Sequence, residues 1–255
     1  MKRIIAIAAL LSIVALTTFA QDEDSSGESN NFRRTKSKVG GAGGFIPGWG
    51  LFKFDEINKV LQSSGLPLIP KSEPMYLAGG EGYGYIMFLK NVRMGGRGIG
   101  GTISSTTFDK TTNVTKSVDY RISYGGFLVD YVMPIGDRLD VSIGLTLGGG
   151  SVNITVTRDD GSGKLWDDLW TEFGANTATK NKTQHLNGSF FALQPSANIE
   201  YALLRWFQIR VGVTYPYMTN ASWKLEDDKD ILGVPTKLKP DGPVITGGIM
   251  FGFFN

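Results

Sequence analysis

The only histidine of the 255-residue sequence, His185, lies four residues before Ser189 in a segment with strand-like alternation. Residues four apart in a strand share a face, so one interpretation is a serine hydrolase whose histidine is oriented by Asp167, Asp168 or Glu172. A serine and a histidine this close along one strand are usually a coincidence, and no oxyanion site can be identified beside them. We therefore expect no catalytic residue and no enzyme.

Metal and cofactor binding have little support in the sequence. One histidine and no cysteine leave few ligands for a transition metal. The acidic stretch with Asp227, Asp228 and Asp230 lacks the glycine and the final glutamate of the known calcium loop. The glycine-rich run 96–101 is followed by a β-like segment, where a phosphate-binding loop needs a helix. We expect no metal and no cofactor.

Two neighbouring segments, Ser189–Leu203 and Trp206–Tyr215, carry the clearest pattern in the chain. From Phe191 in the first and Phe207 in the second, the odd-numbered residues are apolar and most even-numbered residues are polar, which is the period of a β-strand. One apolar face and one polar face with charges are typical of a barrel strand that crosses a membrane, with lipid against the apolar side. A soluble barrel would turn the same apolar side inward, and this alternative stays open at this point.

A three-residue turn, Leu204–Trp206, joins these segments into a predicted hairpin. Because facing residues share a face of the sheet, this turn pairs Leu203 with Phe207. The same register places Glu200 opposite Arg210. The interior of an eight-stranded barrel is just filled by side chains, so we predict that Glu200 and Arg210 form a buried ion pair in the lumen.

A second predicted hairpin, formed by Val118–Met133 and Leu139–Val156, changes its apolar side along its length. The change falls at Gly125–Gly126 in the first segment and at Gly148–Gly150 in the second. Paired bulges at the glycines would explain it. Alternatively, the hairpin extends beyond the membrane, where water lies outside and apolar side chains turn inward. We prefer the second explanation, because Phe127–Met133 is close to the roughly 9 to 11 residues of a tilted membrane strand.

Four further strands complete the prediction, over Val39–Phe54, Met75–Leu89, Val92–Phe108 and Pro243–Phe254. The first of these has the alternative interpretation of a plug, and we prefer a strand because it makes the count even. A short amphipathic helix is predicted over Asp55–Ser64. Short turns alternate with longer loops, as in barrels with brief periplasmic turns. The predicted fold is an all-β, antiparallel up-and-down transmembrane β-barrel of about eight strands with a short N-terminal helix, in a barrel domain over residues 39–255.

The N-terminus has the pattern of a secretory signal peptide over residues 1–20, with Lys2 and Arg3, an apolar run and a cleavage site after Ala20. The apolar run is shorter than the roughly 20 residues of a spanning helix. Residues 21–38 are polar and are predicted to be disordered. The formal charge of +2 is too small to suggest a nucleic acid partner.

Together these features resemble the small bacterial outer-membrane β-barrel proteins of the eight-stranded class. The closing strand resembles the aromatic-ended signal read by the barrel assembly machinery, through Ile249, Phe251, Phe253 and Phe254. Members commonly end on the aromatic residue, whereas Asn255 follows it here. The resemblance implies an outer-membrane location, with outer-membrane lipid and the assembly machinery as partners. It implies no activity, because the class includes tethers, adhesins, pores and enzymes.

Two functional hypotheses follow. The first is an outer-membrane barrel with a structural or surface-interaction role, in which the long loops meet an extracellular partner through Trp166, Trp170 and Trp223. The second is a soluble periplasmic barrel that carries a small apolar ligand, and a narrow pore is a further alternative. An apolar cluster beside the short turns favours the membrane; it consists of Met133, Leu139, Tyr201, Leu203 and Phe207.

Overall fold

The computed structural model describes residues 40–161, 181–219, 222–226, 229–235, 238 and 242–253. Several sequence predictions fall outside these residues. They are the signal peptide and polar N-terminus at 1–38, the side chains of Trp166, Trp170, Asp167, Asp168 and Glu172, the pair Asp227 and Asp228, and Phe254.

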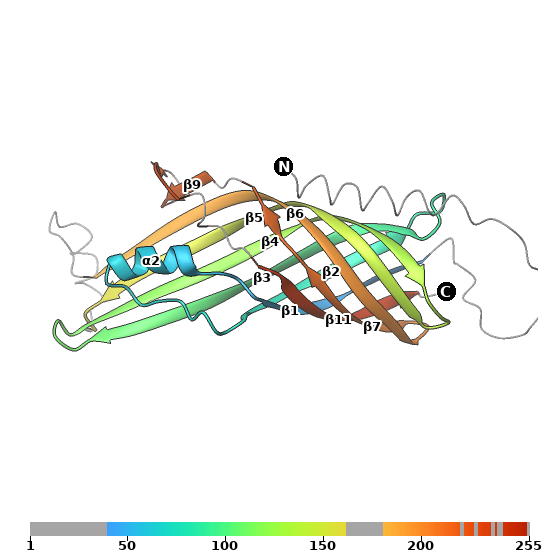
Figure 1. Cartoon of the computed structure of the whole chain (residues 1–255), viewed down its shortest axis with the longest axis horizontal. Coiled ribbons are helices and arrows are strands. Elements are labelled where there is room, and N and C mark those ends of the chain that lie inside the picture. Colours follow the sequence, from blue (N-terminus) through green and yellow to red (C-terminus); the bar gives the residue numbers. More distant parts are fainter. Residues whose placement is uncertain are drawn as a thin grey trace, which may run out of the picture. The chain divides into compact units, whose positions relative to one another are not determined.

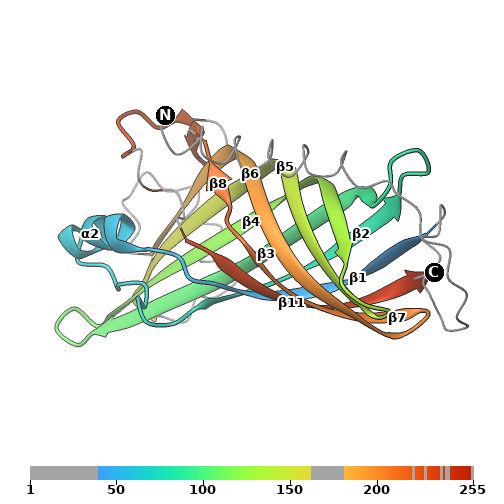
Figure 2. The same cartoon turned by 45° about the vertical axis from the view of Figure 1, so that its right-hand side comes forward.

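Eight antiparallel strands close into a barrel (Figures 1 and 2). They are β1 (Gly41–Gly50), β2 (Met75–Tyr85), β3 (Val92–Asp109), β4 (Val114–Pro134), β5 (Leu139–Asp159), β6 (Lys182–Leu204), β7 (Phe207–Thr214) and β11 (Val244–Phe253). Neighbours pair in chain order, and β11 pairs with both β7 and β1, which closes the ring. The predicted up-and-down barrel is confirmed. Since β1 is a wall strand, the plug alternative is wrong for its residues.

Three small strands and one helix complete the described elements. β8 (Tyr217–Met218) and β9 (Ser222–Leu225) follow β7 along the edge of β6, and β10 (Lys229–Asp230) pairs with β9. The predicted amphipathic helix is α2, Asp55–Ser63, which buries Ile57 and Leu61. Within the described ranges, no helix is both long and apolar enough to cross a membrane.

The wall of the barrel has two unequal halves. β3, β4, β5 and β6 contain 18 to 23 residues, whereas β1, β2, β7 and β11 contain 8 to 11. Figure 1 shows the long strands running past the ends of the short ones toward α2. We call this protruding part the extension; it comprises 101–109 of β3, 114–124 of β4, 150–159 of β5 and 182–190 of β6.

The β4–β5 hairpin changes its apolar side without any change in register. Pairing runs unshifted from Thr115 opposite Asp159 to Pro134 opposite Asp140, so the explanation by paired bulges is wrong. Near the turn the odd-numbered apolar residues face outward, and the Phe127 side chain is 51% exposed. In the extension the even-numbered residues of β4 carry the apolar side chains, and Val118 is fully buried. Odd-numbered residues of β4 and β5 thus face outward along the whole hairpin, but they are apolar near the turn and polar in the extension.

An apolar core therefore lies on the inner face of the extension. The even-numbered residues of β4 and β5 pack there against Phe52, Phe54 and the buried face of α2. Asn58 fixes the chain that returns from the helix, because its side-chain amide donates to the Ile69 carbonyl and accepts from the Ile69 N–H, both at 2.9 Å. The segment 51–74 thereby supplies the cover that the extension needs to keep its apolar inner face from water.

The hairpin between β6 and β7 departs from prediction at its turn. Glu200 lies opposite Arg210, in the predicted register. Nearer the turn, however, the pairing shifts between Ala202 and Leu204, so that Leu204 and not Leu203 lies opposite Phe207. One extra residue on β6 is a β-bulge, which adds local twist. The predicted Leu203–Phe207 pair is therefore wrong.

Candidate functional site

The predicted serine and histidine do not form a catalytic pair. Ser189 and His185 both lie on the outer face of β6, but at about 3.3 Å per residue their positions are about 13 Å apart along the strand. The His185 Nδ1 lies instead 3.1 Å from the Thr155 hydroxyl on β5. Since a base must be within hydrogen-bond reach of its nucleophile, these residues give the hydrolase interpretation no support.

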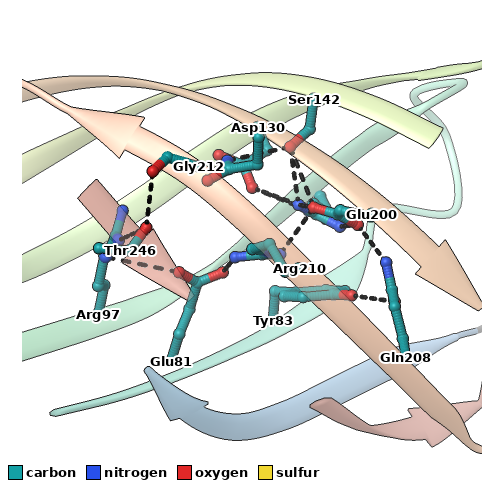
Figure 3. A network of polar contacts seen from close by, with 12 residues as sticks. Glu81, Tyr83, Arg97, Asp130, Ser142, Glu200, Gln208, Arg210, Gly212 and Thr246 are labelled. Atoms are coloured by element: carbon teal, nitrogen blue, oxygen red, sulfur yellow. Dashed lines mark hydrogen bonds and ion pairs between the residues drawn. The ribbon is translucent and has the colours of Figure 1, made fainter. Parts of the chain in front are cut away.

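A different cluster of charged residues lies inside the barrel. It contains three arginines and three carboxylates from five strands, and each side chain is exposed by no more than 6%. The members are Glu81 on β2, Arg93 and Arg97 on β3, Asp130 on β4, Glu200 on β6 and Arg210 on β7. We call these six residues the lumen network. Figure 3 shows its members converging from the surrounding strands.

Glu200 is at the centre of the lumen network. One of its carboxylate oxygens, Oε1, lies 2.9 Å from the Arg210 Nη2, so the structure brings the predicted pair together. The other oxygen accepts from the Arg93 Nη1 at 2.8 Å and from the Gln208 side-chain amide at 2.6 Å. Each of these donors replaces hydration that burial removes from the carboxylate.

Arg93 is as fully enclosed as Glu200. Its Nε donates to the Asp130 Oδ2 at 2.9 Å, and its Nη2 donates to the Ser142 hydroxyl at 3.2 Å. The guanidinium carbon lies 3.9 Å from the centroid of the Tyr83 ring, which adds a cation–π contact. Arg93, on β3, therefore bridges the Asp130 carboxylate on β4 and the Glu200 carboxylate on β6.

Glu81 extends the lumen network to the opposite wall. It accepts a hydrogen bond from Arg210 and lies 3.6 Å from the Arg97 Nε. The Arg97 Nη1 in turn donates to the Thr214 hydroxyl on β7 at 3.0 Å. Positive and negative side chains thus alternate across the lumen from Asp130 to Arg97 (Figure 3). The arrangement fills the barrel with compensated charge.

Sequence reasoning missed most of the lumen network. Glu81, Arg93 and Arg97 were visible as charges, but glycines surround them and contribute no side chain to either face. The glycines allow close strand contact: a Cβ added at Gly79 would lie 1.9 Å from the Gly98 carbonyl oxygen. The sequence did contain one signal for them. Glu81, Arg93 and Arg97 all occupy odd-numbered positions, and in β2 and β3 these positions point inward.

The outer surface of the ring is apolar where its interior is polar. Tyr201, Leu203 and Val211 are exposed by 39%, 40% and 61%. Beside the turn of the β6–β7 hairpin, the rings of Trp206 and Phe251 stack with centroids 6.1 Å apart. The candidate assembly residues Ile249, Phe251 and Phe253 lie on the exposed face of β11. An apolar band with aromatic side chains near one rim is typical of a lipid-facing wall.

Trp223, which the sequence places in a long loop as a candidate contact with an outside partner, lies in a strand. Trp223 belongs to β9 and is only 8% exposed. It packs over Gly188 of β6, where an added Cβ would lie 2.9 Å from the indole ring. The long connection that contains Trp223 returns to the sheet, so its indole contributes to the core of the extension.

The described residues contain no group of three or more histidine, aspartate or glutamate side chains suited to a metal ion. Of the predicted acidic stretch, only Asp230 lies within them, as part of β10.

Neither the protein-family models nor the curated proteins give a match to this chain. Among solved structures, the chain is similar to a major outer membrane protein from Thermus thermophilus, at 11% identity over 84% of this chain and 99% of that one, with a TM-score of 0.45. It is also similar to Acinetobacter baumannii CarO, at 15% identity over 83% and 96% of the two chains, with a TM-score of 0.37. The N-terminal β-barrel domain of Pseudomonas aeruginosa OprF gives 12% identity, 85% and 98% coverage and a TM-score of 0.37. The resemblance to small outer-membrane β-barrel proteins is one of architecture.

Proposed function

We propose that this protein is an outer-membrane β-barrel with a closed lumen, whose extension makes an interaction at the cell surface. The exchange of faces along β4 carries the proposal. Phe127, Val129 and Tyr131 direct apolar side chains outward in the ring, whereas Ser117, Asp119 and Arg121 occupy the outward positions of the extension. A wall with lipid outside its lower part and water outside its upper part requires this pattern.

The lumen network supports a closed barrel over a narrow pore. Arg93, Glu200 and Arg210 are exposed by only 0 to 2%, and they compensate one another's charge directly. A conducting lumen would need water along these side chains. The protein therefore has a structural or surface role in this proposal, with outer-membrane lipid around the ring and the barrel assembly machinery as its partner during biogenesis.

The polar side chains inside the eight-stranded ring do not support the hypothesis of a soluble carrier for an apolar ligand. Such a carrier would place apolar side chains inside, but the inward residues from Gln194 to Glu200 of β6 are polar. The apolar interior of the extension is filled by Phe54, Ile57 and Leu61 of the chain itself.

The proposal is tested by cell fractionation and by gel mobility with and without boiling. We expect an outer-membrane protein, processed after Ala20, whose band shifts on heating. The sequence has no cysteine, so Thr157→Cys in the extension and Asp137→Cys in a short turn each introduce a unique thiol. A membrane-impermeant maleimide added to intact cells should label the first variant and spare the second. A soluble periplasmic protein without a heat shift would overturn the proposal.

A further inference from the structure

Among the described residues, β3 has a hydrogen-bonding partner on only one side over residues 102–109. β4 pairs with β3 as far as Asp109, but β2 pairs with it only from Arg93 to Gly100. β2 still lies beside Gly101, where an added Cβ would be 2.1 Å from the Tyr76 carbonyl oxygen. Residues 102–109 therefore form a strand edge that no described strand pairs with on the β2 side, which we call the β3 edge. The corresponding edge of β6 is covered by β8 and β9.

The direction in which the N–H and C=O groups of β3 point follows from two hydrogen bonds near its first residue, Val92. The Val132 N–H on β4 donates to the Asn91 carbonyl at 2.8 Å, and the Ile86 N–H donates to the Val92 carbonyl at 3.0 Å. Backbone groups alternate sides along a strand, so odd-numbered residues of β3 bond to β4 and even-numbered residues face the β2 side. At the β3 edge, the N–H and C=O groups of Ser104, Thr106 and Phe108 consequently face away from β4, and no hydrogen bond joins them to another described residue.

Prolines keep the chain's own preceding segment away from this edge. If the β2–β3 register continued upward from Ala78 opposite Gly100, Pro74 would lie opposite Ser104 and Pro70 opposite Phe108. These are the positions that would donate to the β3 edge, and proline has no N–H to donate. β2 therefore begins at Met75, and no described segment pairs with the β3 edge beyond it.

The β3 edge also lacks the features that usually protect an exposed strand. The sequence from Thr102 to Phe108 contains no charge and no proline, and its pairing with β4 has no bulge. Long, flat and uncharged edges recruit further strands. The side chains beside an added strand differ between the two faces: Ile103 packs against the apolar core of the extension, and Ser104 and Thr106 are exposed on the outside.

We propose that the β3 edge binds an extended segment of another protein as an additional strand. The partner segment alternates apolar residues, which continue the core beside Ile103, with polar residues beside Ser104 and Thr106. Backbone hydrogen bonds provide the affinity, and the alternation provides the specificity. This inference rests on the proposed surface role, since it names the kind of partner that the extension would take.

A second copy in the same membrane fits this edge poorly. In two copies that share one membrane, the β3 strands run in the same direction relative to the membrane. A two-fold axis that pairs identical strand edges in one sheet requires them to run in opposite directions. We therefore commit to a segment of a different protein.

The test uses the full protein refolded in detergent micelles and a fluorescent peptide of alternating valine and threonine, of the same length as the β3 edge. The matched control peptide carries N-methyl groups on alternate amides. We expect saturable anisotropy changes with the first peptide only. Ser104→Pro combined with Thr106→Pro should weaken binding about tenfold or more, because two backbone donors are lost. Ser104→Ala combined with Thr106→Ala keeps both donors and should bind like the wild type.

Folding of the variants is checked by the heat-dependent gel shift, which the prolines should preserve because neither N–H bonds to β4. Hydrogen exchange gives an independent readout: the amides of Ser104, Thr106 and Phe108 should exchange faster than their odd-numbered neighbours and slow down with peptide. Slow exchange in the free protein, self-association without peptide, absent binding, or equal binding by the proline variant would each overturn the inference. Fractionation does not depend on the edge, so an outer-membrane protein that fails these tests leaves the proposed function intact.

Discussion

Arg93 on β3 donates across the lumen to Glu200 on β6, with 2.8 Å between the Nη1 and Oε2 atoms. The two residues are 107 positions apart in the chain, and neither side chain is exposed by more than 1%. They connect opposite parts of the wall, so the ring is held together by its interior as well as by its strand ladders. The first prediction concerns this internal connection.

Arg210→Ala should destabilise the barrel by about 3 to 5 kcal/mol, because Glu200 and Glu81 would both lose a buried counter-charge. The free energy of unfolding in lipid vesicles, followed by denaturant titration, measures the effect. Arg138→Ala removes an exposed arginine from the β4–β5 turn and should change it little. An unchanged unfolding midpoint for Arg210→Ala would contradict the role assigned to the lumen network.

Gly79→Ala and Gly98→Ala should differ although the two residues are near neighbours on the paired strands β2 and β3. A Cβ at Gly79 would meet the Gly98 carbonyl oxygen at 1.9 Å, whereas a Cβ at Gly98 has no atom within 4 Å. Overpacking against backbone costs about 1 to 3 kcal/mol, so only the first variant should unfold at a clearly lower denaturant concentration. Equal midpoints would show that the strands separate more easily than their contact suggests.

Asn58→Ala should loosen the segment 51–74 without weakening the ring. The variant leaves the buried N–H and C=O of Ile69 without their side-chain partner, at a cost of about 1 to 3 kcal/mol for each group. Limited proteolysis of the folded protein should then cut this segment faster, while the heat-dependent gel shift is retained. Ser63→Ala, an exposed position on the same helix, is the control and should resist cleavage like the wild type.

Acid should loosen the turn between β3 and β4. The Asp109 carboxylate accepts from the Thr112 hydroxyl and from the Thr111 N–H, both at 2.9 Å, and these hydrogen bonds lower the pKa of Asp109 below its ordinary value. A carboxyl group whose pKa is lowered by folding stabilises the fold at pH values above the ordinary aspartate pKa. This stabilisation is lost as the pH falls through the pKa that the group has in the folded protein. The protection factor of the Thr111 amide, which is its intrinsic exchange rate divided by its measured rate, should fall once the pH drops below the ordinary aspartate range. In Asp109→Asn it should show no such dependence on pH.

The alternation of β4, β5 and β6 was readable from sequence because apolar and polar residues keep a period of two on both sides of the glycines at which β4 and β5 change their apolar side. The bulge at Leu203 was not, since one extra residue beside a tight turn leaves no trace in a period of two. The position of Trp223 was also missed, because a long polar connection carries no sign that its segment β9 returns to the sheet. The lumen network could not be predicted, because the alternation within single strands does not show which side chains of distant strands meet inside the barrel.

The unequal halves of the wall also bear on the order in which the protein folds. β4 and β5 contain 21 residues each and are joined by a short turn, whereas β1 and β11 contain 10 residues each and meet only after the whole chain between them is in place. Contacts between distant segments form more slowly than local ones. The central hairpin should therefore nucleate the barrel, and closure of the β1–β11 seam should limit its rate of maturation.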